Sequence, residues 1–137
     1  MASTTRKRAV VVKAADCIRG QFRKLKAEYP EIQVSLTTFN EYKRVIPPRR
    51  LPDEMRDHKL DGSLKGICEC HLAGDVLLLY EHKDDVVFML YICRHEDLYG
   101  KRGKHLATHL RKQLLKLQEE LEQSRQGQDE KVERKRR

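Results

Sequence analysis

The sequence lacks a long hydrophobic run, a disulfide pattern and an internal repeat. No apolar stretch approaches the ~20 residues that a membrane-spanning helix needs, so we expect no membrane partner. No apolar segment with a small-residue cleavage site follows the first residues, so we expect no secretory signal and a cytoplasmic location. The 4 cysteines among 137 residues are not spread like a disulfide framework, and we expect free thiols.

Positive charge is the first informative feature that is present. Lys and Arg number 29 against 21 Asp and Glu, which gives a net charge of +8 in a chain long enough for one domain. A basic domain without a membrane signal is a candidate for binding polyanions, and nucleic acids are the first of these. Charge alone does not distinguish ribosomal RNA, messenger RNA, DNA or an acidic protein.

The N-terminal third predicts a strand followed by two helices. A valine-rich run predicts a strand over residues 8–13. Apolar residues at helical spacing predict an amphipathic helix over residues 14–29. Pro30 begins a second helix, which must end before Pro47 and Pro48. A long loop over residues 47–66 is then expected, and long loops in small domains are often functional.

Beyond this loop the hydrophobic period changes to two. Three β-type runs cover residues 67–72, 76–82 and 86–94, and the two gaps between them have hairpin length. This pattern predicts an antiparallel meander whose one face is covered by the two helices, with the first strand in the same sheet. The predicted fold class is therefore α+β.

The C-terminal region carries leucines at helical spacing, namely Leu106, Leu110, Leu114, Leu117 and Leu121. We expect an amphipathic helical extension over residues 101–124 and a charged, solvated or disordered tail over residues 125–137. The leucine stripe has three interpretations: it docks on the chain's own sheet, it holds a partner or a second copy of the chain, or it belongs to a marginal helix.

Histidines gather around the predicted meander: His58 in the loop, His71 at a strand end and His95 after the last strand, with Asp75 in the turn after His71. Imidazole titrates near ~6.5, so one histidine can accept a proton while another donates one. Cleavage of RNA by its own 2′-hydroxyl needs both transfers, and cations to stabilise the transition state. The neighbouring cations are Arg56, Lys59, Lys65 and Arg94.

A structural zinc site is the alternative chemistry for this region. Five nitrogen and sulfur ligands come from Cys68, Cys70, His71, Cys93 and His95. On a regular strand, however, Cys68 and Cys70 face away from His71, and the two-residue spacing of a zinc knuckle is absent. We therefore expect no metal, no cofactor, and cysteines that pack as small apolar side chains.

The order of these residues resembles the signature of YafQ-type toxins in the RelE/ParE superfamily. The loop contains Leu51-Pro52, Asp57-His58, Leu60-Asp61-Gly62 and Lys65-Gly66 in the family's order. The remaining matches are His71, Asp75, Leu78-Leu79-Tyr80, His95 and Tyr99. The resemblance is strong over residues 51–100 and architectural over residues 8–50. Unlike the family's chains, this one continues well beyond Gly100.

The resemblance implies a ribosome-dependent mRNA endoribonuclease, the toxin of a bacterial type II toxin–antitoxin module, with a RelE-like domain over residues 8–100. It implies three kinds of partner: a cognate antitoxin, the ribosome and mRNA. By match to the family, His58, His71, Asp75 and His95 are catalytic, and Tyr99 shapes the RNA site. We expect His95 to be the general acid. Either His58, or His71 assisted by Asp75, is the base or orients the phosphate.

A non-catalytic relative is the remaining alternative. In this hypothesis the chain is an inactive adaptor, which keeps the RelE-like fold and binds its partner through the leucine-striped helix. Single substitutions of the histidines separate the two hypotheses, since an adaptor tolerates them and a nuclease does not.

Overall fold

A five-stranded mixed sheet organises the computed structural model, which describes residues 10–45, 49–99 and 103–136. The spatial order is β1-β5-β4-β3-β2. β1 and β5 are parallel, and every other neighbouring pair is antiparallel. The strands are β1 (Val11–Ala14), β2 (His58–Lys59), β3 (Cys68–His71), β4 (Val76–Lys83) and β5 (Val86–Arg94).

This topology confirms the predicted α+β class, the antiparallel meander and the place of the first strand in the sheet. The strand predicted over residues 8–13 begins at Val11, and residues 8 and 9 lie outside the described part of the chain. β2 was not predicted. It has two residues, too few to show an alternating pattern, and it lies in the segment expected to be an irregular loop.

The rest of this loop contains two short turns of 3-10 helix, η2 (Asp53–Met55) and η3 (Gly62–Leu64). The side chains of Leu51, Met55 and Leu60 are buried, so the loop is anchored to the domain at three points. The loop is therefore an ordered platform on which a site can be built.

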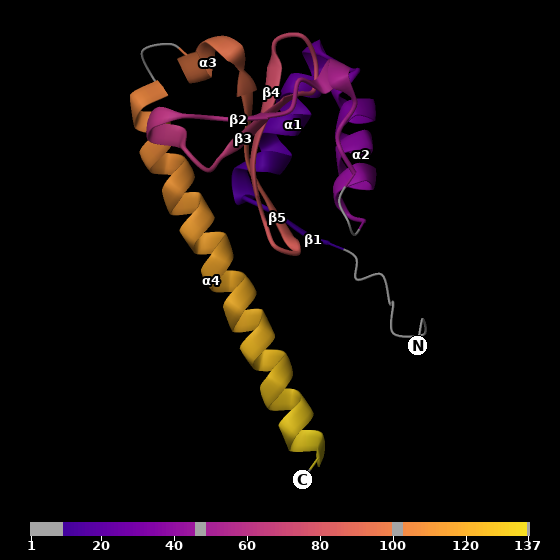
Figure 1. Ribbon diagram of the computed structural model, residues 1–137, viewed down its shortest axis with the longest axis vertical. Coiled ribbons are helices and arrows are strands. Elements are labelled where there is room, and N and C mark those ends of the chain that lie inside the picture. The colour runs from indigo at the N-terminus through magenta and orange to yellow at the C-terminus, as the bar shows by residue number, and fades with distance from the viewer. Residues whose placement is uncertain (1–9, 46–48, 100–102, 137) are drawn as a thin grey trace.

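The predicted helical pair is present as α1 (Asp16–Glu28) and α2 (Ile32–Lys43). Both lie on the other side of the sheet from the C-terminal helix (Figure 1). The Phe39 ring of α2 meets the Tyr80 ring of β4 edge-on, with 4.9 Å between the ring centroids. Such aromatic contacts, together with the buried Ile18 and Ile32, fix this helical layer on the sheet.

Side chains of α1 also bind the main chain of β5 where β1 has ended. The Gln21 Oε1 atom accepts a hydrogen bond from the Ile92 N–H at 2.8 Å, and the Cys17 thiol donates to the Leu90 carbonyl at 3.4 Å. These contacts satisfy polar groups of a strand edge that would otherwise lack a partner.

The segment after the meander forms two further helices, α3 (His95–Tyr99) and α4 (Gly103–Arg136). Side chains of α4 are described over residues 105–126. Leu106, Leu110, Leu114 and Leu117 are buried, and His109 contacts the Tyr91 ring of β5 at 5.7 Å. The leucine stripe therefore docks on the chain's own sheet, which is the first of its three interpretations.

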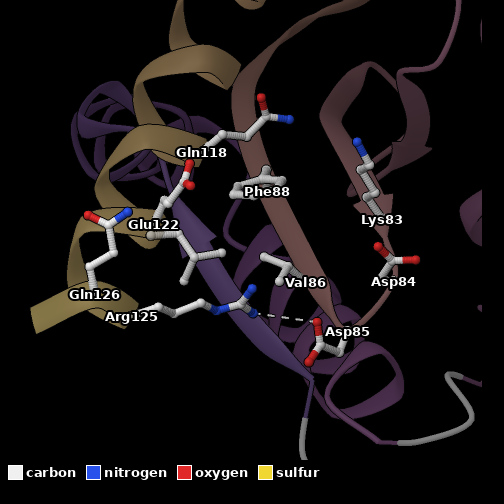
Figure 2. Close-up of a pocket in the computed structure, with 10 residues that line it drawn as sticks. Lys83, Asp84, Asp85, Val86, Phe88, Gln118, Glu122, Arg125 and Gln126 are labelled. Atoms are coloured by element: carbon white, nitrogen blue, oxygen red, sulfur yellow. Dashed lines mark ion pairs between the residues drawn. The ribbon is translucent and has the colours of Figure 1, made fainter. Parts of the chain in front are cut away.

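Polar contacts hold α4 at both ends of this interface. Near the start of the helix, the Arg111 guanidinium donates a hydrogen bond of 2.8 Å to the Ser63 carbonyl in η3. Further along, Arg125 pairs with Asp85 in the β4–β5 turn at 3.6 Å (Figure 2). A hollow of about 430 Å³ lies between that turn and α4 (Figure 2).

The backbone of α4 is helical through Arg136, well past residue 124, where we expected the helical extension to end. Figure 1 shows the last part of this helix projecting from the body of the fold. No helix within residues 10–45, 49–99 and 103–136 is long and apolar enough to cross a membrane.

We predict that the docking of α4 contributes measurably to stability. Leu110 is fully buried, so Leu110→Ala should lower the free energy of unfolding by about 2–5 kcal/mol through lost burial and cavity formation. Leu115 lies on the same helix but is 59% exposed, so Leu115→Ala should change it by less than about 0.5 kcal/mol. Urea unfolding of both variants measures the difference, and equal effects would contradict the docked position of α4.

Candidate active site

A buried carboxylate lies at the centre of the histidine cluster. Glu69 is on β3, and its side chain is 2% exposed. Three side chains from three segments converge on it: His58 of β2, His71 of β3 and Tyr99 of α3. A carboxylate removed from water is destabilised unless it is paired and hydrogen-bonded, so these contacts are required by its burial.

His58 presents one ring nitrogen to the main chain and the other to Glu69. Its Nδ1 atom lies 2.7 Å from the Arg56 carbonyl, which can only accept, so Nδ1 carries a hydrogen. Its Nε2 atom lies 3.8 Å from Glu69 Oε2. The imidazolium form, with a proton on each nitrogen, therefore suits both the Arg56 carbonyl and the Glu69 carboxylate. The His58 side chain is half-exposed to solvent.

His71 is more deeply placed, with a side chain that is 14% exposed. Its Nε2 atom lies 3.5 Å from Glu69 Oε1. A hydrogen on Nε2 directed at the carboxylate leaves Nδ1 with a free lone pair, so a neutral His71 can accept a proton at that atom. The two histidines thus face different oxygens of one carboxylate, His58 facing Oε2 and His71 facing Oε1.

Tyr99 joins His95 to this group. The Tyr99 hydroxyl donates a 2.7 Å hydrogen bond to Glu69 Oε2, and its ring lies against the His95 ring with 4.4 Å between centroids. Burial, followed by the hydrogen bond to Glu69 and its negative charge, raises the pKa of Tyr99 to about 12. The phenol is therefore a stable donor at neutral pH, and it links α3 to the sheet.

Asp75 contributes its main chain to the cluster. Its carbonyl accepts a hydrogen bond of 2.9 Å from the His95 N–H, which fixes the start of α3 against the β3–β4 turn. No described hydrogen bond or ion pair joins the Asp75 carboxylate to a histidine. Its charge acts instead on Tyr29: desolvation and the carboxylates of Glu28 and Asp75 raise the pKa of that phenol.

The structure distributes the four predicted cations unevenly. Arg56 borders a hollow of about 300 Å³ that also touches His71 and the β3–β4 turn. Lys65 is exposed in the loop, whereas Lys59 alternates with His58 on β2 and acts electrostatically on Cys68. Arg94 forms ion pairs with Glu28 and Glu96, so its charge is partly neutralised.

The strand register separates Cys68 and Cys70 from His71 and Cys93 in the predicted alternative zinc site. Glu69 pairs with Leu79 and His71 with Leu77, whereas Cys68 pairs with Tyr80 on the α2-covered face. Burial raises the pKa of the thiols of Cys68, Cys70 and Cys93, which disfavours the thiolate that a metal needs. Within the part of the chain that the structure describes, no three His, Cys, Asp or Glu side chains are arranged to hold a metal ion.

Glu69 was not predicted as a site residue from the sequence. It alternates with His71 along a strand, so the two share one face, but nothing local distinguished it from a solvated glutamate. The position of Glu69 was the one available signal. A carboxylate inside a strand, next to apolar strands of the meander, lies either at a sheet edge in contact with water or beside groups that pair with its charge. The partners come from the loop and from α3, which only the folded chain brings together.

We predict that Glu69→Gln lowers the pKa of Tyr99 from about 12 toward the ordinary value of ~10, because a neutral amide no longer opposes phenolate formation. Carbon-13 NMR of labelled tyrosine measures the titration. Since the folded pKa is raised, the contact stabilises the fold fully below pH ~10 and is lost as the pH rises through about 12. Asp53→Asn, at an exposed loop carboxylate, is the control and should leave Tyr99 unchanged.

The chain was compared with known families and structures. A family model described as the bacterial toxin of type II toxin–antitoxin system, YafQ, matches residues 18–100. A protein of Haemophilus influenzae named "putative toxin YafQ" is 44% identical over 32 residues. This alignment covers 23% of the present chain and 31% of that relative, so the two are compared over less than a third of the relative's length.

Solved toxin structures share the fold. A copper-bound mutant toxin from Helicobacter pylori has 25% identity and a TM-score of 0.53, covering 65% of this chain and 98% of its own. The E. coli DinJ–YafQ toxin–antitoxin complex contains a chain with 22% identity and a TM-score of 0.54, covering 65% of this chain and 96% of its own. Almost the whole of each neighbour therefore corresponds to about two-thirds of this chain.

The matched residues 18–100 contain β2 to β5, α2, α3 and most of α1, and with them every residue of the histidine cluster, whereas β1 lies before them. α4 lies beyond the end of the family match. The chain belongs to the YafQ family of bacterial toxins of type II toxin–antitoxin systems.

Proposed function

We propose that this protein is a ribosome-dependent endoribonuclease that cleaves mRNA, and that it acts as the toxin of its module. The observation that carries the proposal is the sharing of the buried Glu69 carboxylate by His58 and His71, with Tyr99 connecting it to His95. Three imidazoles in distinct environments supply the base, the acid and the cation that RNA cleavage requires.

The reaction uses the 2′-hydroxyl of the RNA as nucleophile. His71, oriented through Nε2 by Glu69, takes the hydroxyl proton on Nδ1 as the oxygen attacks the adjacent phosphorus. The bond from phosphorus to the 5′-oxygen breaks, and His95 donates a proton to that leaving oxygen. The products are a 2′,3′-cyclic phosphate and a 5′-hydroxyl, and the base and acid have exchanged protonation states.

His58 and nearby cations stabilise the negative charge that develops on the phosphate. The imidazolium of His58 faces Glu69 yet remains exposed, so it can contact a phosphate oxygen, and Arg56 and Lys65 lie in the same loop. Tyr99 keeps the His95 ring beside the cluster, and Asp75 fixes its main chain. The route consists of proton transfers within the protein and RNA, so we propose it as metal-independent.

The proposed partners follow from the family and from charge. A structural neighbour is a toxin–antitoxin complex, which supports a cognate antitoxin for this chain as well. The net charge of +8 supports binding to ribosomal RNA and mRNA in the cytoplasm. We further propose that residues 8–100 form the toxin domain, residues 101–124 an extension docked on it, and residues 125–137 a charged tail.

The proposal is tested by mapping cut sites in an mRNA during translation in a purified system, with and without ribosomes. His95→Ala should reduce the cleavage rate by at least about 100-fold, because the leaving oxygen then has no positioned acid. His109→Ala, at a histidine on α4 that contacts Tyr91 away from the cluster, is the control and should cleave normally. Cleavage that persists in His95→Ala, or that needs no ribosome, would contradict the acid assignment or the ribosome-dependent step respectively.

A further inference from the structure

A second buried polar cluster lies on the opposite side of the sheet, directly behind His58. It consists of Lys43 at the end of α2, Tyr80 on β4 and Asp57 in the loop. The Tyr80 hydroxyl donates a hydrogen bond to Asp57, and the Lys43 Nζ atom lies 3.6 Å from the other Asp57 carboxylate oxygen. The same ammonium lies 5.5 Å from the centroid of the Tyr80 ring.

Two members of this cluster belong to the core of the fold. Lys43 is 8% exposed and Tyr80 1%. A buried ammonium is strongly destabilising without a carboxylate partner, and Asp57 is that partner. Burial, with the Asp57 hydrogen bond adding to it, raises the pKa of Tyr80, so the phenol stays protonated and donates. The core therefore holds the loop at Asp57.

Asp57 directly precedes His58 in the chain, so its contacts with Lys43 and Tyr80 affect the histidine cluster. Asp57 is preceded by Arg56, whose backbone is left-handed at φ 46°, a conformation that a residue other than glycine adopts only when its surroundings impose it. Met55, buried at 4% exposure, and Asp57 anchor the two sides of this residue. The resulting turn directs the Arg56 carbonyl at His58 Nδ1, 2.7 Å away.

We propose that Asp57, held by Lys43 and Tyr80, is a positioning residue for His58. The anchored turn presents the Arg56 carbonyl that keeps a hydrogen on His58 Nδ1, and it thereby leaves Nε2 directed at Glu69. Asp57 touches no reacting atom and acts through the orientation of the imidazole. The expected effect on catalysis rests on the proposed nuclease function. The orientation of the His58 ring does not depend on that proposal.

Nitrogen-15 NMR of the histidine side chains in the full-length protein tests the orientation directly. In the wild-type protein, at a pH high enough for the His58 imidazolium to have lost one proton, the remaining hydrogen should lie on Nδ1. Asp57→Asn should shift this population toward hydrogen on Nε2 and leave the His71 signals unchanged. The matched control is Asp61→Asn, the same substitution at an exposed position of the same loop, which should leave His58 as in the wild type.

A second variant guards against misfolding, because Asp57→Asn leaves the Lys43 charge buried without its partner. Lys43→Met/Asp57→Asn removes both charges and keeps similar volumes, so it should fold while the loop lacks the ion pair and is held only by a neutral hydrogen bond from Tyr80 to the amide oxygen of the introduced asparagine. Both variants should cleave mRNA with a rate constant lowered by roughly 100-fold at saturating substrate, since a small misplacement of a catalytic group has an effect of this size.

The outcomes separate the two proposals. A changed His58 tautomer in both variants, with normal behaviour of Asp61→Asn, supports the positioning role even if the wild-type protein cleaves no RNA, a result that would overturn only the nuclease proposal. An unchanged tautomer in a folded Lys43→Met/Asp57→Asn protein would overturn the positioning role and leave the cluster as a stabilising element of the core.

Discussion

The contacts of the Glu69 carboxylate connect the fold of this protein to its candidate site. A carboxylate that is 2% exposed requires partners, and the chain supplies them from a loop, a strand and a short helix. None of these partners is close to Glu69 in sequence except His71. Formation of the buried ion cluster therefore requires the meander, the loop and α3 to be in place together, and the same requirement arranges the three histidines.

The loop that carries His58 is held from both faces of the sheet. On one face His58 meets Glu69, and on the other Asp57 meets Lys43 and Tyr80. Consecutive residues of an extended chain point to opposite faces, so the pair Asp57-His58 can bind both layers at once. This explains how a strand of two residues can hold a half-exposed imidazole in a defined orientation.

α4 removes an apolar face of the sheet from water. The sheet face that carries Glu69 and His71 also carries the apolar Leu77 and Leu79 through the strand register, and α4 covers that face with its leucine stripe. The family match ends before this helix. The helix also fastens η3 through the bond from Arg111 to Ser63, so it supports the loop beside the site while Tyr99 and His58 remain accessible.

Much of this architecture is readable from the sequence, because it depends on local periodicity. Apolar runs bounded by turn residues indicated the three strands of the meander, proline separated the two helices, and the spacing of Leu106, Leu110 and Leu114 indicated one apolar face. The order of the histidines was also sufficient to indicate the family. β2 and the full length of α4 were not readable, since a two-residue strand has no period and the apolar residues of α4 nearly vanish after Leu121.

Residue type and local spacing are properties of the chain, so the residues that can transfer protons, and the elements that carry them, follow from the sequence. The partners of these residues follow from the folded arrangement. Glu69 contacts His71, Arg94 is engaged by Glu28, and Cys68 and Cys70 face away from His71, whereas Cys93 lies on the same face as His71. These outcomes depend on strand register and on contacts between residues distant in sequence, such as His58 with Glu69, 11 positions apart, and Glu28 with Arg94, 66 positions apart. A small difference in strand pairing moves a side chain to another face.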